Sequence, residues 1–316
     1  MSIPDWVVIV IDIKNLVPLL VVCEDDSDIP AGLLRYFTLG NLPDEIKRLS
    51  KLGLDSCKVY VRNTKSSKDR HGSGGLSKNS LMVRTVKIIK DTNPEMHVGT
   101  EVCVCAYSSI GECVLLGHEG KIDDTATHDY VASMAVLHAD AGADILVAGL
   151  THNGSVRAMR SALNSHGHTD LTVMASIQLR TRYYEPYRKL MGTEPEAGET
   201  FRSHLQPDDA DGVLSQAETY VREGAGSLSI QPAMIATDLI QKLRHKFSLP
   251  LMAFSVSTEL ELVRGNNPDL WIEPGREYIL AEYFNSLIRL GATQIQTYVA
   301  GDLAEWLIES GQPETC

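Results

Sequence analysis

The stretch Ala139-Asp140-Ala141-Gly142-Ala143-Asp144-Ile145-Leu146-Val147-Ala148 decides the fold class of this chain. A segment with helical spacing ends at a glycine, a two-residue turn follows, and a short apolar run begins at once. A glycine just past a helix end adopts the left-handed conformation that other residues avoid, so it marks the end of the helix. The short apolar run predicts a buried strand. The stretch therefore predicts a helix leading directly into a strand of a parallel sheet.

The same order of helix, glycine and strand recurs at Gly53, Gly224 and Gly291. Working outward from these points, we predict short strands that alternate with helices along the whole chain. The predicted strands cover residues 17–22, 56–61, 97–104, 144–148, 172–175, 227–231, 250–254 and 294–298. The predicted helices cover residues 43–52, 79–89, 129–141, 156–165, 210–223, 233–246 and 277–290.

Alternation of this kind over 316 residues predicts an α/β protein that forms a single (β/α)8 TIM barrel. We expect the barrel to cover residues 15–316 and to follow a short N-terminal arm, residues 1–14. The alternative is a doubly wound open sheet, which usually carries a glycine-rich phosphate loop after its first strand. Here the acidic run Cys23-Glu24-Asp25-Asp26 stands at that place and would repel phosphate. Two long loops, 63–77 and 191–209, follow predicted strands, and we expect them at the mouth of the barrel.

Composition excludes several classes of protein. Hydrophobic residues make up 43% of the chain, which is too many for a disordered protein. No apolar run is long enough to span a membrane, and the apolar segment 6–13 is interrupted by Asp12 and lacks a basic flank. The formal net charge of −12 argues against a nucleic-acid surface. We therefore expect a cytoplasmic protein that binds neither nucleic acid nor membrane.

Three of the six cysteines, Cys103, Cys105 and Cys113, fall within eleven positions at the end of the third predicted strand. Thiolates two residues apart can face one site if the strand ends between them, and a third thiolate can join them from the following loop. Zn²⁺ held by three thiolates keeps an open position for water or substrate and can act there as a Lewis acid. The alternative is that these are buried cysteines acting as small hydrophobic residues.

Several motifs are spread over residues 15 to 307. They are LVPL at 16–19, PAGLLRY at 30–36, KDxxGS at 68–73, EVCVCAYS at 101–108, YEPYR at 184–188, VSxE at 256–259, TY at 297–298 and WL at 306–307. With these motifs the chain resembles the 5-aminolevulinate dehydratase (porphobilinogen synthase) family. The resemblance implies the same barrel fold and a zinc site at the three cysteines.

The family uses two barrel lysines, each of which forms a Schiff base with one 5-aminolevulinate. Counting back from Pro186 and Pro232, the resemblance places these lysine positions at Gln178 and Gln231. An amide nitrogen is not nucleophilic because its lone pair is delocalised into the carbonyl, so glutamine can only form hydrogen bonds. We therefore do not expect the two-lysine synthesis of porphobilinogen here. The alternative for both glutamines is that they only bond to neighbours in a silent site.

Other candidate site residues follow from the resemblance. Glu101 beside the zinc motif suits a general base; the alternative is that it accepts backbone hydrogen bonds. Arg180 and Arg182 stand where the family has small residues, and either attract an anionic ligand or pair with acidic neighbours at the surface. His152 and His204 fall near the expected mouth, where lone histidines are more often structural. The residues implied to bind substrate are Tyr184, Arg188, Ser257 and Tyr298.

Three functions remain open at this stage. The first is a diverged lyase that binds 5-aminolevulinate or a related small keto or amino acid, and uses zinc and the glutamines for an imine-independent condensation, cyclisation or dehydration. The second is a non-catalytic family member, a pseudoenzyme that acts as a ligand sensor or partner subunit. The third is residual porphobilinogen synthesis by another lysine, for which Lys189 follows Arg188 and is expected to point away. The resemblance also implies a homo-oligomer, a dimer or larger.

Overall fold

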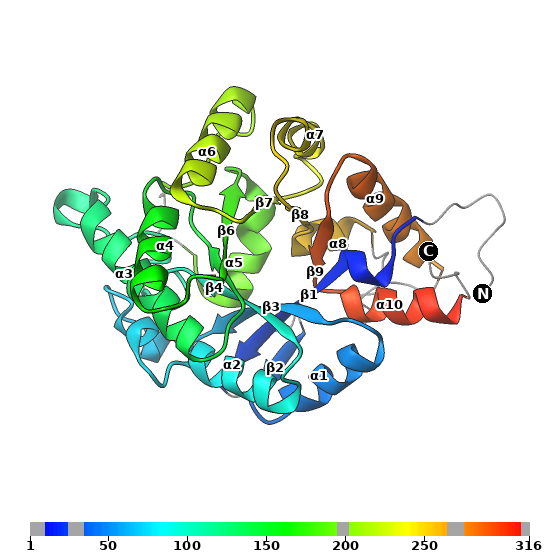
Figure 1. Cartoon of the computed structure of the whole chain (residues 1–316), viewed down its shortest axis with the longest axis horizontal. Helices are drawn as coiled ribbons and strands as arrows, with labels where there is room; N and C mark the ends of the chain where they lie inside the picture. The colour runs from blue at the N-terminus through cyan, green and yellow to red at the C-terminus, as the bar shows by residue number, and fades with distance from the viewer. Residues whose placement is uncertain (1–9, 25–34, 195–201, 264–274, 311–316) are drawn as a thin grey trace.

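A computed structural model describes residues 10–24, 35–194, 202–263 and 275–310. Parallel strands form a closed barrel with helices outside it, as Figure 1 shows. The sheet closes because β1 pairs with β3 on one side and with β9 on the other. The predicted (β/α)8 TIM barrel is thereby confirmed. Its eight strands are β1 (Leu16–Cys23), β3 (Ser56–Arg62), β4 (His97–Val102), β5 (Ile145–Ala148), β6 (Thr172–Gln178), β7 (Ser227–Gln231), β8 (Leu251–Phe254) and β9 (Gln294–Thr297).

Helices connect successive strands. All seven predicted helices are present, with ends that differ by up to five residues. The largest differences are at α3, which begins five residues earlier than predicted, and at α7, which begins four residues later. The matching helices are α1 (Leu42–Lys51), α2 (Leu81–Thr92), α3 (Asp124–Asp140), α4 (Ser155–Ser165), α6 (Ala210–Glu223), α7 (Thr237–Lys246) and α9 (Glu277–Arg289).

Besides short 3-10 helices, one strand and three α-helices of the described residues were missed by the sequence-based prediction. Strand β2 (Tyr36–Thr38) pairs with the end of β1 outside the barrel. Helices α5 (Glu185–Met191) and α8 (Ser257–Val263) have only seven residues each. Isolated helices of this length are not stable, so their local sequence carries little signal. Helix α10 (Ala300–Glu309) packs against β1 and was also missed.

The glycines at the helix–strand turns adopt the predicted conformation. Gly142 and Gly291 have φ angles of 104° and 111°, which side chains with a Cβ atom rarely adopt. The turns between helix and strand are short as a result, and each helix lies against the strands that it connects. The largest apolar core lies between strands and helices.

Alternate residues of each strand point into the barrel. On β3, for example, Cys57, Val59 and Val61 belong to the core shared with the helices, so that Lys58 and Tyr60 face the interior. A lower interior cluster contains Val147, Met174 and Met252. An upper cluster near the carboxyl ends of the strands contains Leu19, Val21, Tyr60, Tyr184, Leu190, Met191, Phe254 and Val256.

Some predictions fall outside the described residues. These include most of the apolar piece of the N-terminal arm, the larger part of the PAGLLRY motif and residues 195–201 of the second long loop. Within the described ranges, none of the helices is both long and apolar enough to cross a membrane.

Candidate functional site

A partly open cavity lies at the carboxyl ends of the barrel strands. The space between its walls measures about 720 Å³, part of it open to solvent. It therefore has room for a small molecule only. This end of a TIM barrel carries the active site in characterised enzymes of the fold. The predicted site residues in its wall are Glu101, Cys103, Cys105, Gln178, Tyr184, Arg188, Cys113, Gln231 and Tyr298.

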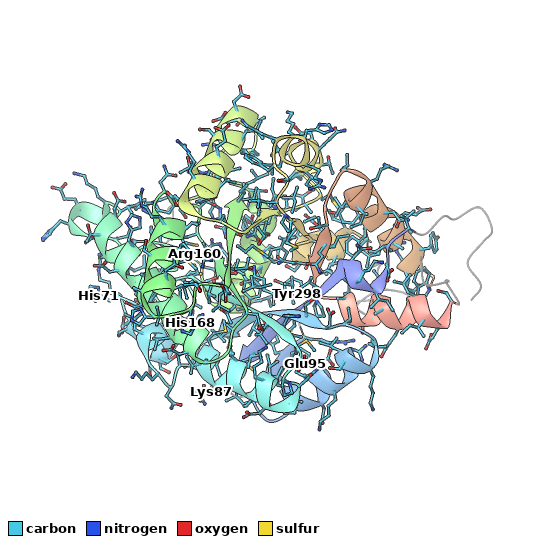
Figure 2. The ribbon with its side chains drawn as sticks, viewed as in Figure 1. His71, Lys87, Glu95, Arg160, His168 and Tyr298 are labelled. Carbon is cyan, nitrogen blue, oxygen red and sulfur yellow. The ribbon has the colours of Figure 1, made fainter. Side chains whose placement is uncertain are left out.

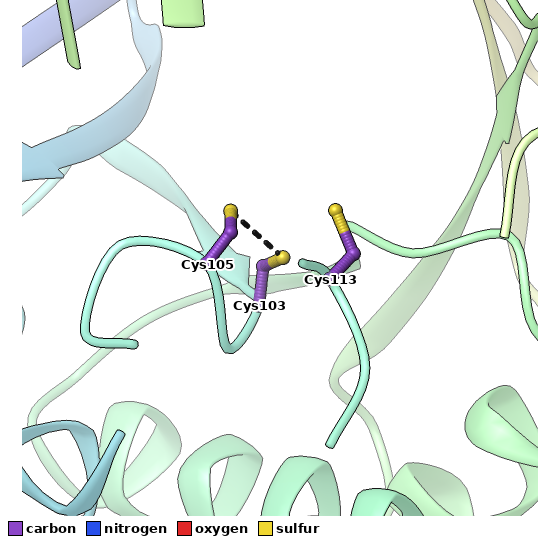
Figure 3. Close-up of side chains that lie close together, drawn as sticks. All are labelled: Cys103, Cys105 and Cys113. Carbon is purple, nitrogen blue, oxygen red and sulfur yellow. Dashed lines mark hydrogen bonds between the residues drawn. The ribbon is translucent and has the colours of Figure 1, made fainter. Parts of the chain in front are cut away.

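The three predicted cysteines meet on one side of this cavity (Figure 3). Cys103 and Cys105 follow β4, and Cys113 comes from the loop after it. The Sγ atoms of Cys103 and Cys105 are 3.2 Å apart, and all three Sγ atoms lie within 4.8 Å of one another. Strand β4 ends at Val102, two residues before the predicted end, because the chain turns to bring the thiols together.

The thiols differ in acidity. Hydrogen bonds from Cys103 and Cys105 lower the pKa of Cys113 well below its ordinary value. Hydrogen bonds with Cys105 and Cys113, together with burial, raise the pKa of Cys103. Cys113 is therefore the thiol of the group that most readily gives up its proton. A metal ion would displace the thiol protons.

This donor set fits a soft metal ion. Tetrahedral coordination with a Zn–S distance of about 2.3 Å places thiolate sulfurs about 3.8 Å apart. The three atoms here have one pair at 3.2 Å and all lie within 4.8 Å of one another, a range that includes this distance. Thiolates favour zinc among the common divalent metals of hydrolytic and lyase chemistry. Cys103, Cys105 and Cys113 would hold the ion and leave a fourth position toward the cavity.

Arg188 supports the cysteine group from helix α5. Its Nη2 atom lies 3.8 Å from Sγ of Cys113, and its Nη1 atom donates to the carbonyls of Gly111 and Thr193 at 3.1 Å each. The residue is 6% exposed. His204 lies beside it, with Nε2 3.5 Å from Nη2 of Arg188, and burial lowers the pKa of His204. His204, which the sequence left open, therefore belongs to the cavity wall.

The two glutamines lie side by side at the ends of β6 and β7, where they are in register. Gln178 Nε2 donates to the carbonyl of Gly149 at 3.2 Å, and Gln231 Nε2 donates to Oγ of Ser176 at 3.0 Å. Among the described residues, Oε1 of Gln178 has no hydrogen-bond partner. Both amides are therefore fixed by one bond, and at least one retains an unused acceptor in the cavity wall.

Glu101 reaches the cavity from β4. Its Oε2 atom lies 2.9 Å from Nζ of Lys58, and both side chains are largely buried. Burial raises the pKa of Glu101, and the charge of Lys58 opposes that shift. Among the described residues, the carboxylate of Glu101 faces the ammonium of Lys58 and accepts none of the backbone hydrogen bonds that were the alternative for it.

Lys58 itself was missed by the sequence-based prediction. A signal was present: its strand neighbours Cys57, Val59 and Val61 form an apolar alternate face typical of the side packed on helices. Lys58 therefore had to face the barrel interior, an uncommon place for a lysine.

Aromatic side chains form the rest of the wall. Tyr184 donates its hydroxyl to the carbonyl of Gln231 at 2.8 Å. The ring of Tyr298 packs 6.2 Å from that of Phe254, and Tyr298 is labelled near the centre of the molecule in Figure 2. Its hydroxyl is buried without a hydrogen-bond partner within the described ranges. The wall thus offers a second unsatisfied polar atom.

Three predicted residues lie outside the cavity wall. Ser257 is the first residue of α8 and is 1% exposed, next to the lining residue Val256. Arg182 is exposed and pairs with Glu185 at 2.7 Å, which matches the surface alternative for it. Arg180 is half-buried, and its Nη2 lies 3.5 Å from the carbonyl of His204.

His152 also lies away from the cavity, where its Nε2 pairs with Asp124 at 3.1 Å. The two predicted loops do meet near the mouth. Lys68 of the first donates to the carbonyl of Gly192 in the second at 2.6 Å. Gly192 lies between the lining residues Met191 and Thr193.

These features define the class of the protein: a TIM barrel with a cavity at the carboxyl end whose wall contains a group of three thiols that fits a metal ion. The sequence model of the delta-aminolevulinic acid dehydratase family matches residues 12–306. The chain belongs to the delta-aminolevulinic acid dehydratase family.

Known relatives are similar over most of their length. The delta-aminolevulinic acid dehydratase of Bacillus subtilis is 31% identical over 277 residues, which cover 87% of this chain and 84% of the relative. That of Methanothermobacter thermautotrophicus is 31% identical over 277 residues, covering 87% and 82%. The structure of the Toxoplasma gondii enzyme, solved with porphobilinogen, has the same fold, with a TM-score of 0.91 and 22% identity over 98% of this chain and 90% of that one.

Proposed function

We propose that this protein binds 5-aminolevulinate or a related small keto or amino acid in the barrel cavity. The observation that carries the proposal is the wall itself, where a soft-metal thiol group and two unsatisfied polar atoms, Gln178 Oε1 and Tyr298 Oη, surround a space of small-molecule size. Buried polar atoms without partners are costly, and a bound ligand would satisfy them.

The chemistry we propose is a lyase-type condensation, cyclisation or dehydration with no imine at positions 178 and 231. Zinc at the three cysteines would supply a Lewis acid for a ligand oxygen. The amides of Gln178 and Gln231 would orient a carbonyl or carboxylate by hydrogen bonds, and Arg188 would contribute positive charge beside Cys113. Porphobilinogen is not the expected product, because the family reaction needs one imine at each of these two positions and glutamine cannot form an imine.

A non-catalytic sensor is the second candidate. The amide nitrogens of Gln178 and Gln231 already donate to Gly149 and Ser176, as expected for glutamines that only bond to neighbours in a silent site. This candidate shares the ligand with the first and differs only in turnover.

Thermal-shift measurements with 5-aminolevulinate, levulinate and small amino acids test the binding proposal. We expect a concentration-dependent rise in Tm that Gln178→Ala weakens and Arg182→Ala leaves unchanged, because only the first residue lines the cavity. Mass spectrometry of the products then separates enzyme from sensor. Efficient porphobilinogen formation, or the absence of any ligand in the keto-acid and amino-acid series, would overturn the proposal.

A further inference from the structure

One lysine occupies the barrel interior close to this cavity. Lys58 lies on β3 with its side chain pointing inward and is 1% exposed. Its side chain thus enters the barrel from a strand far from β6 and β7, where the two glutamines stand.

The Lys58 ammonium lies behind side chains that line the cavity. Nζ is 2.9 Å from Oε2 of Glu101, 4.8 Å from the ring centre of Tyr60 and 5.2 Å from that of Phe254. Glu101, Tyr60 and Phe254 all line the cavity, whereas Lys58 does not. One layer of side chains therefore separates the amine from the space where a ligand would bind.

The Lys58–Glu101 ion pair is not expected to add to the stability of the fold. Removing an ammonium and a carboxylate from water costs free energy that their attraction seldom exceeds, and well-packed apolar residues usually serve a core as well or better. Neighbouring interior positions are filled by Val147, Met174 and Met252 in just this way. A buried lysine beside a cavity is also the usual form of an amine nucleophile.

We propose that Lys58 is the carbonyl-capturing amine of this site and forms an imine with the ketone of a small keto acid. This inference rests on the proposed function for its ligand, and it replaces the expectation of a reaction without any imine. The flexible four-carbon stem allows Nζ to pass from the back of Glu101 to its cavity side.

The step balances without an additional reactant. The Lys58 ammonium and the ketone give a protonated imine and one water: the C–N bond forms, the carbonyl oxygen leaves as water, and two of the three ammonium protons leave with it. The protein keeps a single positive charge on the same nitrogen. Glu101 can therefore pair with the iminium as it pairs with the ammonium.

Reductive trapping tests the proposal on the unmodified protein. Levulinate, a keto acid without an amino group, is added with sodium cyanoborohydride, and the digested protein is mapped by mass spectrometry. We expect one adduct per chain, on the peptide that contains Lys58, with the mass of levulinate less one oxygen atom. Pentanoate, which has no ketone, should give none.

Variants provide a matched comparison. Lys58→Met should abolish the adduct, and Lys189→Met, which removes an exposed lysine outside the cavity wall, should leave it unchanged. If Lys58→Met fails to fold, the peptide map of the unmodified protein still decides the question. An adduct on Lys68 or Lys189, or no adduct at a levulinate concentration that raises Tm, overturns the role of Lys58 and leaves the binding proposal intact. No rise in Tm with any keto acid or amino acid would instead overturn the proposed function.

Discussion

Nη2 of Arg188 lies 3.8 Å from Sγ of Cys113, so the cation of helix α5 rests against the most acidic thiol of the site. The same guanidinium bonds two backbone carbonyls, at Gly111 and Thr193. One side chain thereby links α5, the loop that carries Cys113 and the loop after α5. The geometry of the thiol group depends on this link.

Arg188→Met should reduce the free energy of unfolding by about 2 to 3 kcal/mol, because it leaves buried carbonyls and a thiolate without their charged donor. Arg182→Met is the matched control. Arg182 makes an exposed ion pair with Glu185, so its loss should change stability by less than about 0.5 kcal/mol. Urea unfolding followed by circular dichroism measures both. Equal effects of the two variants would contradict the linking role of Arg188.

Metal analysis should find about one zinc per chain in protein purified without chelators. Cys103→Ala, Cys105→Ala and Cys113→Ala should each lose most of it, because two thiolates hold zinc far less tightly than three. Cys23→Ala should retain the metal, since Cys23 is a buried cysteine whose Sγ lies near the carbonyl of Phe37. Full zinc content in Cys103→Ala would show that the group does not bind the metal.

His138 should make stability depend on pH. It is fully buried on α3, with Nδ1 3.1 Å from Oγ1 of Thr100, and burial lowers its pKa from 6.5 to about 3. Between these values the unfolded chain binds a proton that the folded protein does not. The stabilisation is complete above about pH 6.5 and falls as the pH drops toward 3, by up to about 1.4 kcal/mol per pH unit.

His138→Gln should remove this dependence and keep a polar partner for Thr100. The free energy of unfolding is compared as the difference between variant and parent at each pH. This is needed because burial raises the pKa of Glu259 from 4.5 to about 7, which makes stability fall with rising pH in that range, opposite to the effect of His138. Urea unfolding at pH 7 and pH 5 measures the difference. A parent and variant that lose stability in parallel would rule out His138 as the source.

Gly149→Ala should disturb the cavity directly. A Cβ atom at this position would collide with the carboxylate of Glu101, which lines the cavity and pairs with Lys58. We expect a loss of about 1 to 3 kcal/mol in stability and a weaker ligand-induced rise in Tm. Gly40→Ala is the control, because among the described residues its Cβ would meet Oγ1 of Thr38 alone, at an ordinary contact distance of 3.7 Å. Normal ligand response in Gly149→Ala would mean that Glu101 can move without consequence.

Much of the fold was predictable because its signals are local. Gly142 adopts the left-handed conformation where its helix ends, and an apolar run such as Ile145–Ala148 identifies a strand directly. Strand ends were less predictable: β6 extends three residues past its predicted end, to Gln178. The length of β6 depends on its pairing with β7, which joins residues that are far apart in the sequence.

The candidate site likewise has residues that the sequence predicts and residues whose position only the structure shows. Sequence spacing alone brought Cys103, Cys105 and Cys113 to one strand end, and the structure places them within one metal's reach. The family resemblance implied that Ser257 binds substrate and left Arg182 open between a ligand and a surface ion pair; the structure places both outside the cavity wall. Whether a loop residue faces the cavity depends on helices α5 and α8, which are too short to be predicted locally.

By itself, the sequence determined the barrel, the cysteine group and the absence of lysine at positions 178 and 231. Only the tertiary structure decided that a lysine stands behind the same cavity. Lys58 and Glu101 are 43 residues apart in the chain, yet lie 2.9 Å apart because β3 and β4 are neighbours in a closed sheet. Because the sheet closes into a barrel, one face of every strand points inward. The amine of Lys58 is therefore buried.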